Sequence, residues 1–183
     1  MEQSNPGWFV SSLGVSAAGA LVTGCFACGT DLAWRRIPNV ITFGSALAGF
    51  AWHAWSAGAG GAAWALAGWG VGLALLMPLY LLRSMGAGDV KLLAAFGAWV
   101  GPVDAVWAGL FGTIAGGVLA LFVAVSSGYL GTAVRNLYTL LMFWRVSGVR
   151  PMDDLTIDTS RGPRLARAIP MLVGVVVTLW LKQ

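Results

Sequence analysis

Long apolar runs separated by short polar segments dominate the pattern of hydrophobic and polar positions along this chain. A helix needs about 20 apolar residues to cross a bilayer, and somewhat fewer where it is short or re-entrant. The fourth apolar run is short and could begin inside a water-filled cavity, where irregular backbone at membrane depth is tolerated. The pattern predicts six membrane-spanning helices: Trp8–Gly29, Val40–Trp55, Ala62–Leu82, Val90–Val100, Ala105–Ser126 and Ala168–Leu181.

The segment after the fifth span has a helical rather than a continuous apolar pattern. Its apolar residues recur at helical spacing along one face, and its polar residues Arg135, Asn136 and Arg145 lie away from that face on the helical wheel. We therefore expect an amphipathic helix in the cytoplasmic membrane interface. Residues 150–164, RPMDDLTIDTSRGPR, are rich in turn formers and are expected to form an exposed loop with solvated acids. The apolar positions of the amphipathic segment are Leu130, Ala133, Val134, Leu137, Leu140, Leu141 and Trp144.

Composition supports a membrane protein and excludes several kinds of site. The 183 residues are 58% hydrophobic and 10% charged, whereas a soluble domain carries about 25% charged residues. The length fits one membrane-embedded domain, residues 1–183, in contact with lipid and not with nucleic acid. The only histidine is His53, and Cys25 and Cys28 lack the further ligands of a zinc site, so we expect packing cysteines and no metal or cofactor.

The basic residues indicate how the chain sits in the membrane. Ten of the eleven lie in segments on one side of the predicted spans, and Lys182 lies on the other. By the positive-inside rule that side is cytoplasmic, so both termini face out. Most tryptophans, including Trp99, fall near the predicted outer edge, as an aromatic belt would, and His53 is expected at that interface. Asp104, in a short outer loop, is expected to be a solvated charge.

Two acids remain after the loop acids and Glu2 are set aside. Asp31 closes the first span and Asp89 opens the fourth, so both are predicted at the cytoplasmic ends of their helices. An ionisable group at membrane depth is costly and indicates function by default. The simpler alternative is local ion pairing, of Asp31 with Arg35 and of Asp89 with Lys91 or Arg83.

Two carboxyl groups that meet in a partly desolvated pocket share one proton over a wide pH range. The ionised group can take a proton from an attacking water while the other donates to the carbonyl oxygen, which is aspartic peptidase chemistry. We expect Gly86 and Gly88 to adopt backbone conformations closed to other residues and to leave room for a substrate strand. Helix polarity favours Asp89, at a helix N-terminus, as the anion and Asp31, at a C-terminus, as the acid.

Two motifs give the chain a resemblance to a known family. GAGDVK, Gly86 to Lys91, resembles the GxGD motif of the type IV prepilin peptidases, and DLAWRRIPN, Asp31 to Asn39, resembles their first aspartate motif. The resemblance implies that Asp31 and Asp89 are the catalytic pair and that Gly86, Gly88, Lys91, Ile37, Pro38 and Asn39 support the site or bind substrate. It further implies cleavage of a short basic leader from pilin or pseudopilin precursors at the cytoplasmic face of the bacterial inner membrane.

The chain also departs from the bifunctional members of that family. It has neither their additional cytoplasmic region nor their four-cysteine zinc motif, so we expect no methyltransferase domain. It resembles the short, peptidase-only kind that accompanies Tad/Flp tight-adherence pilus systems. Archaeal preflagellin peptidases, presenilin-type proteases, a proton-coupled transport subunit and a non-catalytic pilin-binding factor are the alternatives. A second copy of the chain is a candidate partner, because small residues recur at spacings of four: Gly68 with Gly72, Gly97 with Gly101 and Gly112 with Gly116.

Overall fold

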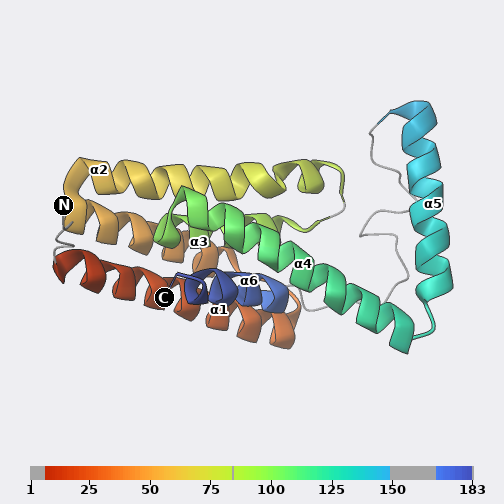
Figure 1. Cartoon of the computed structure of the whole chain (residues 1–183), viewed down its shortest axis with the longest axis horizontal. Helices are drawn as coiled ribbons and strands as arrows, with labels where there is room; N and C mark the ends of the chain where they lie inside the picture. The colour runs from red at the N-terminus through yellow and green to blue at the C-terminus, as the bar shows by residue number, and fades with distance from the viewer. Residues whose placement is uncertain (1–6, 84, 149–167, 183) are drawn as a thin grey trace.

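The described part of the chain, residues 7–83, 85–148 and 168–182 of a computed structural model, is built from helices joined by short turns. Figure 1 shows the helices gathered into a bundle, except for α5, which stands apart from it beyond the end of α4. No strand occurs within these three ranges. The helices are α1 Gly7–Trp34, α2 Asn39–Leu81, α3 Ala87–Val100, α4 Pro102–Ser126, α5 Leu130–Ser147 and α6 Ala168–Trp180.

The long helix α2 is a hairpin of two helical arms. Its backbone leaves the helical region at Ala57 (φ −134°, ψ 17°) and Gly58 (φ 59°, ψ −146°), and the chain reverses there, at the left of Figure 1. The ring centroids of His53 and Trp64 lie 4.9 Å apart, and those of Phe50 and Trp69 lie 6.4 Å apart. From the first of these pairs to the second, the residue number falls in one arm and rises in the other. The arms, residues 39–56 and 59–81, are therefore antiparallel. The break falls between the second and third predicted spans.

Helix α3 is the centre of the bundle. It contacts α1, both arms of α2, α4 and α6. Its 14 residues span about 21 Å, which is less than the roughly 30 Å of a hydrocarbon core. Protein and not lipid therefore surrounds the helix that corresponds to the short fourth span. Its fully buried residues, each 0% exposed, are Leu92, Leu93, Ala94, Ala95, Phe96 and Ala98.

Glycines allow the backbones of neighbouring helices to touch. A Cβ atom on Gly72 would lie 2.6 Å from the carbonyl oxygen of Leu93, and one on Gly68 would overlap the carbonyl oxygen of Gly97. A Cβ on Gly174 of α6 would likewise overlap the carbonyl of Ala108 on α4. The small residues thus serve helix packing within the chain, because close approach replaces the missing hydrophobic driving force in lipid.

Among the described residues, three helices are long and apolar enough to cross a membrane: Gly14–Trp34 of α1, Asn39–Leu81 and Pro102–Ser126, with Ala168–Trp180 a shorter apolar helix. Large apolar side chains cover the outside of the bundle, among them Phe122, which is 70% exposed, and Val118. Such a surface suits lipid and not water. The protein is thus an all-helical membrane protein, while the number of crossings and their direction remain predictions.

Helix α5 confirms the helix expected after the fifth span. Its apolar residues Val134, Leu137 and Leu141 are exposed because the helix stands clear of the bundle. Its position in the membrane interface remains a prediction. The loop expected over residues 150–164 lies outside the described residues.

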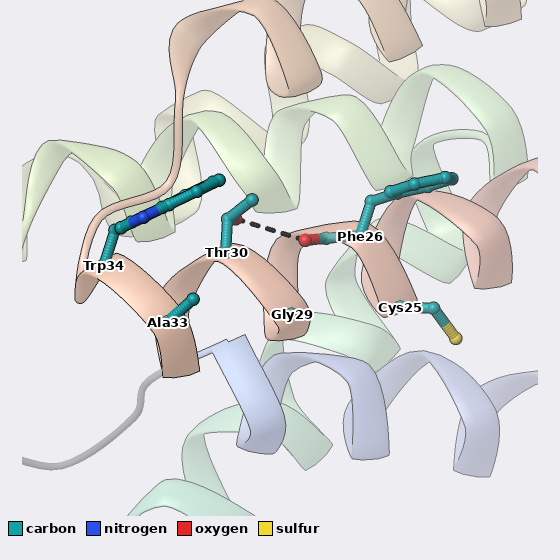
Figure 2. Close-up of a pocket in the computed structure, with 6 residues that line it drawn as sticks. All are labelled: Cys25, Phe26, Gly29, Thr30, Ala33 and Trp34. Carbon is teal, nitrogen blue, oxygen red and sulfur yellow. Dashed lines mark hydrogen bonds between the residues drawn. The ribbon is translucent and has the colours of Figure 1, made fainter.

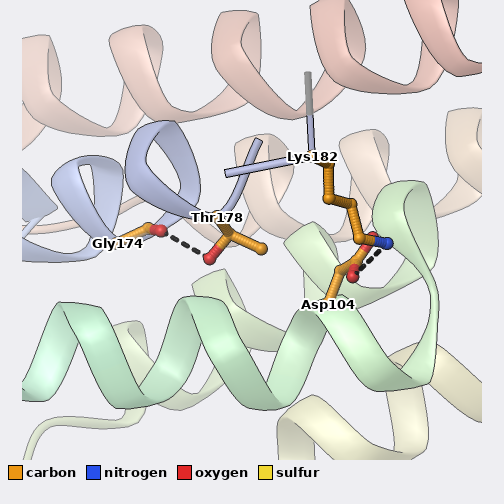
Figure 3. Close-up of polar contacts among 4 residues, drawn as sticks. All are labelled: Asp104, Gly174, Thr178 and Lys182. Atoms are coloured by element: carbon orange, nitrogen blue, oxygen red, sulfur yellow. Dashed lines mark hydrogen bonds and ion pairs between the residues drawn. The ribbon is translucent and has the colours of Figure 1, made fainter. Parts of the chain in front are cut away.

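One expectation for the outer side of the bundle is wrong. Asp104 is not a solvated charge: it is buried in the first turn of α4, and its carboxylate oxygens lie 2.6 and 2.7 Å from Lys182 Nζ (Figure 3). His53 and Trp99 are buried between helices, and their place relative to the membrane interface stays a prediction. His53 Nε2 donates to the carbonyl oxygen of Trp99 at 3.0 Å, and the Trp99 indole N–H donates to Ser45 Oγ at 2.9 Å. Polar side chains here join helices α2 and α3.

Candidate active site

Asp31 lies in the last turns of α1, which continues past its predicted end at Gly29 as far as Trp34. The carboxyl group is 9% exposed. Its Oδ2 accepts a hydrogen bond of 3.0 Å from the backbone N–H of Ala168, the first residue of α6. This partner was not foreseen, because 137 positions separate the two residues and no motif or periodicity connects them.

Asp89 lies in the first turn of α3, after the N-cap residue Gly86. It is 4% exposed, and its backbone N–H donates to the carbonyl oxygen of Gly86 at 3.2 Å. The N-terminus of a helix carries partial positive charge, which favours a carboxylate at this position. Asp31 also lies at a helix N-terminus, that of α6, so helix polarity does not separate the two acids. The expected division into Asp89 as anion and Asp31 as acid therefore loses its basis.

Helices α1 and α3 pack antiparallel, and their contacts define the relative level of the two acids. A Cβ atom on Gly19 would lie 2.6 Å from the ring of Trp99, and one on Gly24 would lie 3.4 Å from Phe96 Cζ. Asp31 is seven positions beyond Gly24, and Asp89 is seven positions before Phe96. Seven residues advance a helix by about 10.5 Å and turn it through about 700°, nearly two full turns. Each acid thus lies on the face of its helix that carries the Gly24–Phe96 contact, displaced equally toward the same end.

The two sequence motifs also meet through their other residues. Ile37, in the turn between α1 and α2, packs against Gly88, where an added Cβ would lie 3.5 Å from the Ile37 side chain. Lys91 Nζ donates to Asn39 Oδ1 at 3.0 Å and lies 5.5 Å from the centre of the Phe43 ring. Pro38 precedes Asn39 as the N-cap residue of α2. Residues from both motifs therefore form one local structure at this end of the bundle.

The backbone conformation expected for the two glycines is wrong, while the room they leave for a substrate strand stays a prediction. Gly86 has φ −77° and Gly88 is helical, so both adopt conformations open to any residue. An added Cβ on Gly88 would make an ordinary contact with Ile37 and no overlap. The left-handed backbone occurs at Arg35 (φ 52°) and Arg83 (φ 54°), where α1 and α2 end. These arginines occupy positions where glycine is the usual residue.

Two of the expected local ion pairs are not formed. In the described residues neither Asp31 with Arg35 nor Asp89 with Lys91 forms an ion pair, whereas Asp104 pairs with Lys182. Pairing of Asp89 with Arg83 stays a prediction. Lys91 lies two positions after Asp89, about 200° around the helix, and is bound to Asn39. Arg35 contacts Asp31 through its backbone N–H, which donates to the Asp31 carbonyl oxygen at 2.9 Å.

A shallow groove of about 310 Å³ on the outside of α1 is separate from the acids. Figure 2 shows its lining, two rows of residues along one face of the helix. Gly29 and Ala33 each lie two positions from Asp31, which places them about 200° around α1. The Thr30 hydroxyl donates to the carbonyl oxygen of Phe26 in its own helix at 3.1 Å. The groove is lined by Cys25, Phe26, Gly29, Thr30, Ala33 and Trp34.

The cysteines behave differently from each other. Cys28 is half-buried and packs against the hydrophobic core, as expected, whereas Cys25 is exposed in the groove. No group of three or more His, Cys, Asp or Glu side chains that could hold a metal ion occurs in the described part of the chain.

The fold and the site define a class: an all-helical membrane protein with two buried carboxyl groups at the ends of adjacent antiparallel helices. Residues 18–125 match the model of the type IV leader peptidase family. Because the match covers more than half of the chain, the protein belongs to this family and is a peptidase, a hydrolase whose substrates are prepilins. Comparison with curated proteins and with solved structures gives no significant match.

Proposed function

We propose that the protein is an aspartic endopeptidase that removes the short basic leader from type IV, Flp-like pilin or pseudopilin precursors, with Asp31 and Asp89 as its catalytic pair. The observation that carries the proposal is the register of α1 and α3. The Gly24–Phe96 contact and two equal steps of seven residues bring both acids to one level and one interface. Both carboxyl groups are also largely withdrawn from solvent.

In the proposed reaction the two carboxyl groups hold one proton between them. The ionised group takes a proton from a water molecule as the water oxygen attacks the peptide carbonyl carbon. The protonated group donates to the carbonyl oxygen, which becomes the hydroxyl of a tetrahedral intermediate. Collapse of this intermediate breaks the C–N bond, and the leaving amine takes the proton that the first carboxyl group received. The second carboxyl group takes back a proton from a hydroxyl of the intermediate as the C=O bond re-forms. The pair is restored without a nucleophilic side chain.

The proposal places this reaction at the cytoplasmic face of the inner membrane. It assumes six crossings, made by α1, the two arms of α2, α3, α4 and α6, with both termini outside. The basic residues Arg35, Arg36 and Arg83 lie in the turns next to the acids, which supports that sidedness.

The first prediction concerns the acids themselves. In a reconstituted assay with purified pilin precursors, Asp31→Asn and Asp89→Asn should each lower the cleavage rate by at least about 10²- to 10⁴-fold, the range for losing a general acid or base. Asp104→Asn is the matched control, because it removes a buried carboxylate at the other end of the bundle. It should cleave at close to the wild-type rate.

Separate outcomes distinguish the alternatives. Cleavage by both asparagine variants at the wild-type rate would leave a pilin-binding factor as the better account. Proton flux into liposomes that depends on Asp31 and occurs without any precursor would favour a transport subunit. Faster cleavage of preflagellin than of Flp-like precursors in the same assay would favour the archaeal-type preflagellin peptidase.

A further inference from the structure

The first turn of α6 contacts the site that the proposed function assigns to catalysis. Ala168 is 0% exposed, and its N–H lies 3.0 Å from Asp31 Oδ2 in a bond that is itself buried. Helices α1 and α6 pack side by side along this region, with Leu172 of α6 in contact with Gly24 of α1. The contact thus belongs to a packed interface and not to a loose chain end.

The chemistry of a helix start explains why this contact should be strong. The first N–H groups of a helix have no partner within the helix, and together they carry partial positive charge. Asp31 supplies an acceptor to one of them from another helix, in the way that an aspartate N-cap does within its own helix. Pro170, the third residue of α6, has no N–H. The first turn of α6 therefore offers few other donors, and Ala168 provides the bond.

We propose that α6 positions Asp31 for catalysis through the backbone amide of Ala168. This inference rests on the proposed function. The bond holds Oδ2 and favours negative charge on the group. Ala168 is in this sense a positioning residue, since it acts on Asp31 and does not touch the substrate.

A backbone ester tests the amide without altering a side chain. Replacing Ala168 by its α-hydroxy acid removes the N–H alone, and the same replacement at Ile169, whose amide is the next along α6, is the matched control. We expect the ester at 168 to cleave precursor about 10- to 100-fold more slowly, the range for a hydrogen bond to a charged group. For the ester at 168, the pH below which the cleavage rate falls should be higher than for the wild type, because the anion of the pair is less stabilised.

Proline substitution provides a second variant from ordinary residues. Ala168→Pro removes the same donor at a helix position where proline is tolerated, and Ile169→Pro is its control. If the proline at 168 prevents folding, the ester still tests the proposal, because the ester keeps the alanine methyl group in its buried place. A rate and pH profile equal to those of the control at 169 would overturn the inference.

The asparagine variants separate this inference from the proposed function. If Asp31→Asn and Asp89→Asn cleave at the wild-type rate, the proposed function fails whatever the esters do. If both asparagine variants are inactive and the esters at 168 and 169 behave alike, the pair is catalytic and the role assigned to α6 is wrong.

Discussion

At the scale of single residues, Arg35 and Arg83 stand out because each ends a helix in a left-handed conformation. A residue with a Cβ atom pays about 1–2 kcal/mol for that backbone relative to an ordinary one. Arg35 lies within the first motif, four positions after Asp31, and Arg83 lies three positions before Gly86, where the second motif begins. The strain is thus located in the turns that lead into and out of the site, where it is tolerated because the packed helices fix the turn.

Arg35→Gly should raise the free energy of unfolding by about 0.5–1 kcal/mol, since glycine adopts this conformation without the Cβ penalty but loses more entropy on folding. Denaturant titration of the purified protein in detergent measures the change. Arg36→Gly is the control. It also removes one positive charge, but Arg36 is not among the residues with positive φ. If the free energy of unfolding rises equally in both variants, the effect is due to the lost charge and not to the backbone conformation.

At the scale of elements, the second arm of α2 fixes the position of α3 by direct backbone contact. Gly68 and Gly72 face the carbonyl groups of Gly97 and Leu93, with no room for a methyl group. A change there moves α3 as a unit, because α3 is a short helix enclosed by protein. Since Asp89 lies in the first turn of α3, packing about one to two turns away affects the position of the acid.

Gly72→Ala should therefore cost about 1–3 kcal/mol of stability, the range for overpacking a filled interior, and should reduce precursor cleavage as α3 shifts. Gly70→Ala is the matched control: nothing lies within 4 Å of a Cβ at Gly70, and alanine is the better helix former. We expect Gly70→Ala to be as stable as the wild type or slightly more so in the same unfolding assay. Equal losses in the two variants would contradict the assigned contact.

How much of these elements the sequence predicts depends on the range of the interactions. Apolar runs predicted the helices and the break near Gly58, and counting crossings predicted one end for Asp31 and Asp89. Length alone indicated that α3 is short. Three features could not be predicted from the sequence, because each depends on which helix faces become neighbours after packing. They are the hydrogen bond from Ala168 to Asp31, the ion pair Asp104–Lys182 and the burial of His53.

At the scale of the whole molecule, sidedness is the property that links the fold to the proposed reaction. Cysteine labelling of intact cells should test it in a variant with Cys25 and Cys28 replaced by serine. Ser56→Cys, at the reversal of α2, should react with a membrane-impermeant maleimide from outside. Arg36→Cys, within the first motif, should react only after the cells are permeabilised. The opposite pattern would invert the topology, and labelling of both from outside would exclude the six crossings.

The enclosure of α3 also has a consequence for how the membrane acts on this protein. Lipids of different chain length press on the outer helices, which must tilt or stretch to match them. The helix that bears Asp89 has no boundary with acyl chains, so such forces reach the acid only after the surrounding helices have absorbed part of them. An enzyme built in this way can keep its chemistry constant while the thickness of its bilayer varies.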